Sequence, residues 1–209
     1  MIELARVVGP PIFFGQPGAT TASVVTFWAV FYIWLGAEIW IGYRRRRLPS
    51  GAVDHDAGSK AWLIGSVWTT AVLGIGSALA FPDAAITSGR PEVFIAGLIL
   101  MVAGLALRWY SIWVLGSSFT CEVTTRPGQE VMQSGPYHWV RHPSYTGGLM
   151  TILGVLLCCA NLVSLAALAV AAAGYAYRIR IEERALATDL GPAYSDYMQR
   201  TKRLIPFLI

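Results

Sequence analysis

The sequence has few charged residues. Asp, Glu, Lys and Arg make up 13% of its 209 residues, whereas a soluble domain usually has about a quarter. Hydrophobic residues make up 55%, and the mean hydropathy is +0.53. This scarcity of charge argues against a soluble globular domain and favours a membrane protein. The net charge of +4 and the pI near 9.1 would also suit nucleic-acid binding, but the placement of the basic residues favours another explanation.

Cysteine is also scarce. The three cysteines are Cys121, Cys158 and Cys159, and their spacing fits neither a metal site nor a disulfide framework. Cys158 and Cys159 are adjacent within an apolar run, so we interpret them as small buried hydrophobic residues. We predict no metal. Residues 1–18 lack the long apolar core of a signal peptide, so we interpret them as part of the mature protein.

Long apolar runs are what the sequence has in abundance. A transmembrane helix needs about 20 mostly apolar residues, and runs 21–43, 61–81 and 92–115 meet this length. A fourth run, 147–177, would be about 46 Å long as one helix, against a hydrocarbon core of about 30 Å. This run is therefore either one overlong helix or a helical hairpin with Asn161 at its turn.

Basic residues favour the hairpin. They concentrate on the cytoplasmic side of membrane proteins, and four arginines, 44–47, close the first run. A turn at Asn161 returns a second basic group to that side: Arg178, Arg180, Arg184, Arg200, Lys202 and Arg203. We therefore predict an all-α integral membrane protein, multi-pass, with about five transmembrane helices and a cytoplasmic C-terminus. The basic pI follows from this orientation and requires no nucleic acid.

Two charged residues, Glu38 and Arg108, fall within the apolar runs. Both are near a predicted cytoplasmic end, so snorkelling to the interface is the simpler explanation, particularly for Arg108. The alternative is that they pair across helices and line a cavity.

The longest polar interval separates the third and fourth runs and includes GPYHWVRHPSYTGG, residues 135–148. Pro143 suits the first turn of a helix, whose free backbone N–H groups would favour a carboxylate or another anion. His142 and Tyr145 would flank this site, and Gly147 and Gly148 permit close approach of a backbone or ligand. Anchoring at the membrane surface explains the same residues equally well.

A second polar cluster, YAYRIRIEERAL, covers residues 175–186. Arg178 and Glu182 are four residues apart and share a helical face, and Glu183 follows. A solvated helix end with internal ion pairs would give this pattern. The hairpin, however, returns the cluster to the membrane face of residues 135–148. We therefore predict one cytoplasmic pocket that binds a polar cofactor and accepts a second substrate from the bilayer.

The order and spacing of GPYHWVRHPSYTG, the hydrophobic hairpin and EERAL resemble the isoprenylcysteine carboxyl methyltransferase family. They are also similar to the related phospholipid N-methyltransferases. The resemblance covers about half of the chain, from residue 116 onward, including the tail YSDYMQRTKRLIPF. It implies a membrane methyltransferase that uses S-adenosylmethionine. Residues 1–115 would be a membrane part and 116–209 the methyltransferase core of a single domain.

The resemblance also implies site residues. The cofactor would contact Gln129, Glu130, Val131, Met132, Tyr137, His142, Pro143, Ser144, Tyr145, Glu182 and Glu183. Gln129 stands where the family commonly has histidine, and Thr124 where the eukaryotic carboxyl methyltransferases have glutamine. Arg178 and Glu182 would be catalytic. Arg178 would bind an acceptor carboxylate bidentately, and Glu182 would hold a ribose or amino group or take a proton from an amine acceptor.

The acceptor implied by the resemblance is lipophilic and comes from the bilayer. It is either an isoprenylcysteine-like carboxylate or a lipid amine. Two other functions stay open. A membrane sterol or enone reductase that uses NADPH shares an R-H-P-x-Y element, although Ser144 and EERAL favour the methyltransferase. A non-catalytic membrane scaffold with a basic cytoplasmic face is the other.

Overall fold

The computed structural model describes residues 21–44 and 51–206. The N-terminal segment and residues 45–47 of the basic cluster, both used in the sequence analysis, lie outside the described residues. The main helices are α2 (Thr21–Arg44), α3 (Ser59–Ala80), α4 (Arg90–Leu115), α5 (Pro143–Cys158), α6 (Leu162–Ala166), α7 (Leu168–Leu190) and α8 (Pro192–Arg200). The short elements are β1 (Val53–Asp54), η2 (Pro82–Ala84), η3 (Gly116–Ser118), β2 (Thr124–Thr125) and η4 (Gly135–His138).

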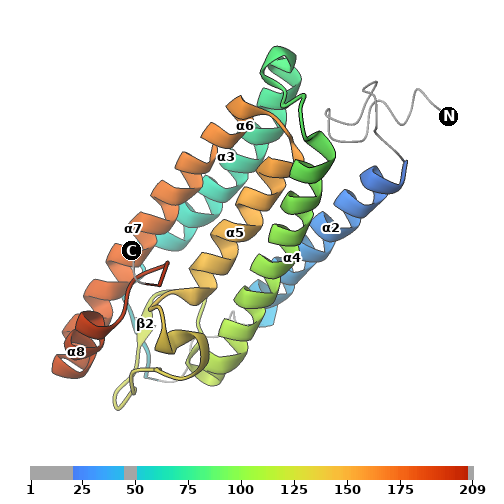
Figure 1. Cartoon of the computed structure of the whole chain (residues 1–209). Helices are drawn as coiled ribbons and strands as arrows, with labels where there is room; N and C mark the ends of the chain where they lie inside the picture. The colour runs from blue at the N-terminus through green and yellow to red at the C-terminus, as the bar shows by residue number, and fades with distance from the viewer. Residues whose placement is uncertain (1–20, 45–50, 207–209) are drawn as a thin grey trace.

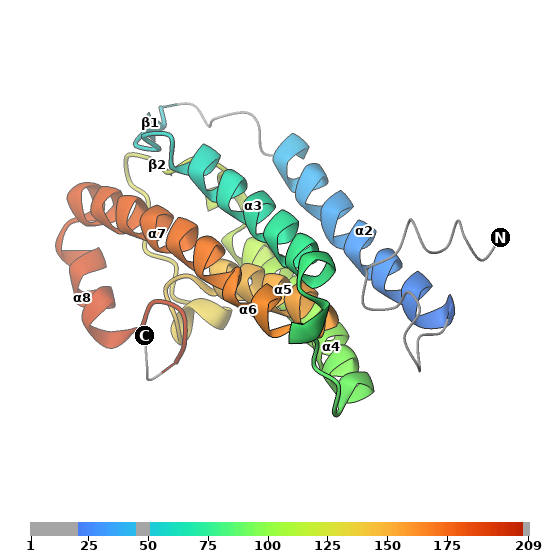
Figure 2. The same cartoon turned by 90° about the horizontal axis from the view of Figure 1, so that it is seen from above.

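The long helices form one bundle, seen from two directions in Figures 1 and 2. Four stretches of the described chain are long and apolar enough to cross a membrane: Thr21–Arg44, Ser59–Ala80, Arg90–Ser118 and Leu162–Leu190. The 16-residue α5 is a fifth apolar helix, about 24 Å long. The predicted all-α membrane fold is confirmed, and α5 is shorter than the other four stretches.

The fourth apolar run is a hairpin, as predicted, and Asn161 lies at its turn. The Asn161 side-chain oxygen accepts hydrogen bonds from the backbone N–H groups of Val163 (2.9 Å) and Ser164 (3.1 Å). Its amide nitrogen donates to the Phe81 carbonyl at 2.8 Å. Asn161 therefore caps α6 and ties the turn to the end of α3. Contrary to the simplest hairpin, the returning leg is divided into α6 and α7 at Ala167.

Glycines allow α4 and α5 to pack backbone against backbone. Gly97 and Gly104 of α4 face Gly154 and Gly147 of α5, each pair seven residues apart along its helix. A Cβ atom added at Gly104 would lie 2.6 Å from the Gly147 carbonyl oxygen, so a side chain there would force the two backbones apart. Such small residues are typical of tightly packed membrane helices. They hold the first turn of α5 against α4.

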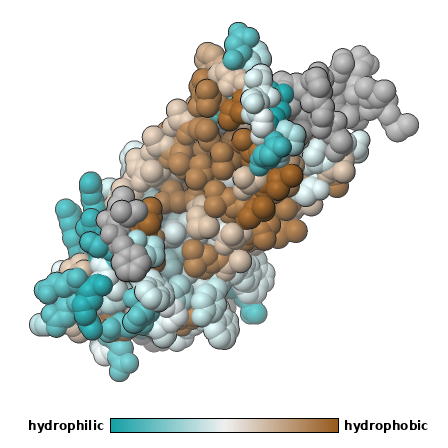
Figure 3. Space-filling model, in the orientation of Figure 1, coloured by the Kyte–Doolittle hydropathy of each residue, from teal (hydrophilic) through white to brown (hydrophobic). Residues whose placement is uncertain are grey.

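The polar elements gather at one end of the bundle. An apolar surface covers its middle, and hydrophilic residues cover the end that contains β2 and α8 (Figure 3). There β1 pairs antiparallel with β2, with Val53 opposite Thr125 and Asp54 opposite Thr124. The α2–α3 linker, residues 116–142 and the end of α7 therefore meet at one end, as the hairpin prediction required.

Candidate active site

A pocket opens at this polar end between residues 115–145, α7 and α8. Its predicted lining residues are Thr124, Gln129, Glu130, Val131, Met132, Tyr137, His142, Ser144, Tyr145, Arg178 and Glu182. Pro143 and Glu183 do not line it. The other lining residues, for which the sequence predicted no contact, are Leu115, Ser118, Phe119, Thr120, Glu122, Val123, Arg141, Leu186, Leu190, Tyr194 and Tyr197.

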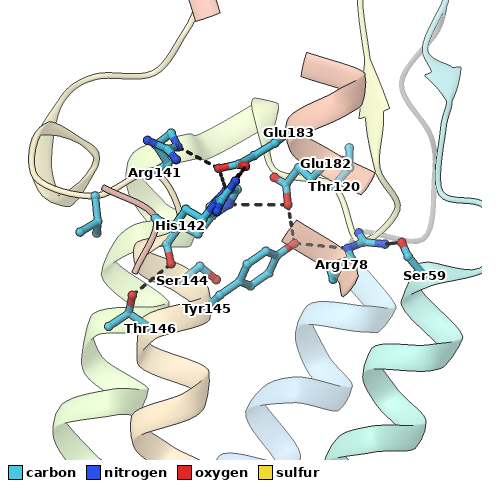
Figure 4. Close-up of polar contacts among 12 residues, drawn as sticks. Ser59, Thr120, Arg141, His142, Ser144, Tyr145, Thr146, Arg178, Glu182 and Glu183 are labelled. Carbon is cyan, nitrogen blue, oxygen red and sulfur yellow. Dashed lines mark hydrogen bonds and ion pairs between the residues drawn. The ribbon is translucent and has the colours of Figure 1, made fainter. Parts of the chain in front are cut away.

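A chain of polar contacts joins the two predicted clusters (Figure 4). Nε of Arg178 donates to the Tyr145 hydroxyl at 3.3 Å, and this hydroxyl donates to Oε2 of Glu182 at 2.6 Å. Nδ1 of His142 lies 3.8 Å from the same oxygen, and the His142 and Tyr145 rings stack with centroids 5.4 Å apart. The first turn of α5 and one face of α7 therefore present a single polar surface.

Arg178 is held by the protein on every side. Nη1 donates to Asp56 and to the Ser59 hydroxyl (2.7 Å), and Nη2 donates to the Cys121 carbonyl (2.7 Å). The side chain is 4% exposed. The family resemblance implies that this guanidinium binds an acceptor carboxylate, but most of its donors already have protein partners. Asp56 and Ser59 were missed because nothing in the α2–α3 linker or at the start of α3 resembles the family motifs.

Glu183 points away from the pocket. Its carboxylate accepts hydrogen bonds from Nε of Arg141 and Nε of Arg203, both at 2.9 Å, and Nε2 of His142 lies at 3.4 Å. The side chain is 8% exposed. This cluster fastens α7 to the residues before α5 and to the C-terminal tail. Glu183 was predicted to contact the cofactor, but it lies at Nε2 of His142 and outside the pocket lining. Pro143 is likewise buried, at the first position of α5.

The tyrosines around the pocket form part of its frame. The Tyr197 hydroxyl of α8 donates to the Tyr137 carbonyl at 2.6 Å, and the Tyr137 hydroxyl lies 3.4 Å from the Ser111 carbonyl. Burial raises the pKa of Tyr197 to about 12 and also raises the pKa of Tyr137. Both phenols therefore stay protonated at neutral pH and act as hydrogen-bond donors.

The backbone at the start of α5 offers fewer free donors than predicted. The N–H groups of Tyr145 and Thr146 both donate to the His142 carbonyl at 3.0 Å, and Pro143 has no N–H. An anion at this helix end would therefore depend mainly on side chains. Gly148 serves the predicted close approach, since a Cβ atom there would lie 2.2 Å from the Tyr175 hydroxyl oxygen.

Glu122 is a pocket residue that the sequence reasoning missed. Its Oε1 accepts from Nζ of Lys60 at 2.5 Å. Its Oε2 is buried and has no hydrogen-bond partner among the described residues. A buried carboxylate oxygen without a hydrogen-bond donor destabilises the folded protein. Binding of a ligand that donates an N–H or O–H group to this oxygen would therefore be favoured.

An apolar groove lies on the side of the bundle, next to the pocket. Its lining comes mainly from α2 and α3: Trp34, Leu35, Glu38, Ile39, Leu63, Ile64, Val67, Trp68 and Ala71, with Arg108, Gly148 and Tyr175 beneath. Arg108 makes a bidentate ion pair with Glu38, at 2.5 and 2.7 Å. The snorkelling interpretation is therefore wrong, and the cross-helix pairing is confirmed. Nη1 of Arg108 also donates to the Ser144 hydroxyl at 3.0 Å, so Arg108 connects the groove to the pocket.

Comparison with known proteins confirms the family resemblance. The model of the isoprenylcysteine carboxyl methyltransferase (ICMT) family matches residues 97–188. Protein-S-isoprenylcysteine O-methyltransferase B of Arabidopsis thaliana is 34% identical over 115 residues, which cover 54% of this chain and 58% of the plant protein. The Saccharomyces cerevisiae protein-S-isoprenylcysteine O-methyltransferase is 30% identical over 134 residues, covering 61% of this chain and 56% of the yeast protein. The chain thus spans roughly half the length of these relatives.

The fold is also that of a solved family member. The structure of the eukaryotic intramembrane Ras methyltransferase ICMT matches 99% of this chain and 74% of that chain, with a TM-score of 0.59 and 22% sequence identity. At this identity the match establishes the shared membrane fold.

Proposed function

We propose that this protein is an integral membrane methyltransferase that uses S-adenosylmethionine to methylate a lipophilic acceptor at a site facing the cytoplasm. The observation that carries the proposal is the polar surface formed by Arg178, Tyr145, Glu182 and His142. It lies inside the segment that matches the methyltransferase family and next to an apolar groove.

The pocket residues fit this cofactor. Its ammonium and ribose hydroxyl groups need acceptors, and the pocket offers the partly exposed Glu182 and the unpartnered Oε2 of Glu122. Phe119, Val131, Leu186 and Leu190 supply apolar surface for a purine ring. Arg141 also lines the pocket, although Glu183 already neutralises it. When bound, S-adenosylmethionine supplies an electrophilic methyl group on a sulfonium.

The side chains of this chain act by positioning. Methyl transfer is an in-line displacement, so orientation and exclusion of water supply most of the rate. Glu182 and the Tyr145 hydroxyl fix hydrogen-bonding groups on one wall of the pocket. For an amine acceptor, Glu182 is also the carboxylate placed to take the released proton. A carboxylate acceptor is already deprotonated at neutral pH and requires no base.

The acceptor reaches the pocket through the groove between α2 and α3. The groove is apolar along α2 and α3 and polar at Arg108, which donates to Ser144 of the pocket. This arrangement suits a molecule with an apolar chain and a polar head. The names of the relatives favour the carboxylate of an S-isoprenylcysteine. A lipid amine is the other acceptor that the site suits.

The first experiment is a thermal shift of the detergent-purified protein with S-adenosylmethionine, S-adenosylhomocysteine or NADPH. A ligand at 100 times its dissociation constant stabilises a protein by about 2.7 kcal/mol. We expect stabilisation by the two adenosyl compounds and not by NADPH. Stabilisation by NADPH alone would indicate the reductase, which the family match does not favour, and no stabilisation by any ligand would indicate the scaffold.

The second experiment identifies the acceptor. Protein in nanodiscs receives S-adenosylmethionine with a labelled methyl group and either N-acetyl-S-farnesylcysteine or phosphatidylethanolamine. We expect base-labile label, a methyl ester, on the farnesylcysteine. Base-stable label on the phosphatidylethanolamine would identify an N-methyltransferase instead.

A further inference from the structure

Asp56 lies in the linker between α2 and α3, outside the segment that matches the family model. Oδ1 of Asp56 accepts a hydrogen bond from Nη1 of Arg178 in α7. The two side chains are 13% and 4% exposed. Because Arg178 is buried, the loss of its carboxylate partner would leave a charge with little access to water.

The start of α3 and the segment before β2 also hold the Asp56 carboxylate. Oδ1 also accepts from the Ser59 hydroxyl (3.2 Å) and the Val123 N–H (3.3 Å), and Oδ2 accepts from the Lys60 N–H (3.2 Å) at the start of α3. The Asp56 N–H donates to Oδ1 of Asp54 at 2.8 Å. The position of this carboxylate is therefore set by the folded chain.

Arg178 transmits that position to the pocket. Its guanidinium is a rigid planar group, so contacts at Nη1 and Nη2 determine where Nε points. Nε donates to the Tyr145 hydroxyl, which donates to Glu182 (Figure 4). A shift of the guanidinium would therefore move both pocket groups, although Asp56 itself does not line the pocket.

We propose that Asp56 is a positioning residue for methyl transfer and acts through Arg178 on Tyr145 and Glu182. This inference rests on the proposed function. The competing explanation is that Asp56 occupies Arg178 in place of an acceptor carboxylate. Under that explanation, removing the Asp56 charge would strengthen acceptor binding. Under ours, it slows turnover with little effect on acceptor binding.

The experiment compares Asp56→Asn with Asp189→Asn as a matched control. Asp189 ties the same linker to the end of α7 through His55, at 2.7 Å, but does not contact Arg178. Turnover and KM are measured with N-acetyl-S-farnesylcysteine. We expect Asp56→Asn to lower kcat by about a hundredfold, as a small misplacement of reacting groups does, with KM nearly unchanged. Asp56→Glu should restore part of kcat, and Asp189→Asn should retain it.

A lowered KM in Asp56→Asn, or an equal loss of kcat in Asp189→Asn, would overturn the proposal. A second measurement requires no acceptor: the affinity for S-adenosylhomocysteine in Asp56→Asn, Glu182→Gln and the double variant. We expect Asp56→Asn to weaken binding in the native background and to have no further effect beside Glu182→Gln. Additive losses would contradict a path through Glu182. Failure of the native protein to bind S-adenosylhomocysteine would instead reject the proposed function.

Discussion

Glu182 and Glu183 are neighbours in the sequence but have different surroundings in the structure. Glu182 faces the pocket with a hydrogen bond from Tyr145, whereas Glu183 is enclosed by Arg141, Arg203 and His142. We expect Glu183→Gln to lower the free energy of unfolding by about 3 kcal/mol, because it leaves Arg141 buried without a carboxylate. Glu182→Gln should cost about 1 kcal/mol or less but weaken binding of S-adenosylhomocysteine.

Thermal unfolding of the two variants, with and without S-adenosylhomocysteine, separates these roles. Each variant is the control for the other, since both replace one glutamate by its isosteric amide on the same helix. Equal destabilisation, or a stronger loss of ligand binding in Glu183→Gln, would contradict the assignment. The motif EERAL predicts both carboxylates but not their directions, because only the packing of the C-terminal tail determines which one is enclosed.

The Asp56 carboxylate should make the free energy of unfolding depend on pH in the acidic range. Burial alone would raise its pKa, but the hydrogen bond from the Lys60 N–H and the charge of Arg178 outweigh burial and lower the pKa of this carboxyl below its usual 3.8. A lowered pKa in the folded state adds stability above the unfolded pKa, and this stability is lost as the pH falls through the folded value. Thermal unfolding between about pH 5 and about pH 3 should show a shallower decline for Asp56→Asn than for the native protein.

At the scale of the helices, the glycine contacts between α4 and α5 position the site. They hold the first turn of α5, which contains Ser144 and Tyr145, against α4. We expect Gly104→Ala to lower the free energy of unfolding by about 2 kcal/mol, because its methyl group would meet the backbone of Gly147 and Thr151. Activity should fall as well, since Arg108 lies one turn further along α4 and contacts Ser144.

Gly76→Ala is the control for this prediction. Gly76 lies within α3, and a Cβ atom added there would have nothing within 4 Å, so alanine should leave stability unchanged or raise it slightly. Thermal unfolding and methyl transfer are measured for both variants. A Gly104→Ala protein as stable and active as Gly76→Ala would show that the close contact is not required.

The helices themselves follow from the sequence because apolar length and proline positions determine them. The predicted runs 61–81 and 92–115 match α3 and α4 to within two residues at each end, and the turn at Asn161 is correct. The division of the returning leg into α6 and α7 did not follow, since Ala167 carries no turn signal. The Glu38–Arg108 ion pair was not the preferred interpretation, because the sequence of one apolar run does not reveal which helix packs against it.

At the scale of the whole molecule, the site residues predicted from the sequence agree best with the structure where the family motifs lie. Residues 135–145 and 178–182 meet at one pocket as the hairpin required. The contribution of the α2–α3 linker and the start of α3 was not predicted, because Asp56 and Ser59 are brought to Arg178 only by the packing of α3 against α7. Likewise, Glu122 was not predicted because its buried oxygen is defined by the folded loop around it.

The distribution of charge along the bundle predicts the orientation of the whole protein. At the polar end lie Arg44, Lys60, Arg126, Arg141, Arg184, Arg200, Lys202 and Arg203, whereas the opposite end has Arg90 among the described residues. Basic residues stay on the cytoplasmic side, so the pocket should face the cytoplasm.

Cysteine labelling in intact cells tests this orientation with Lys202→Cys at the polar end and Asp83→Cys at the opposite end, both exposed positions. Each is placed in a Cys121→Ser background, because Cys121 is partly exposed and would itself react. Cys158 and Cys159 are buried and are left unchanged. A membrane-impermeant maleimide should label Asp83→Cys in intact cells and Lys202→Cys only after permeabilisation, and the reverse pattern would place the pocket outside.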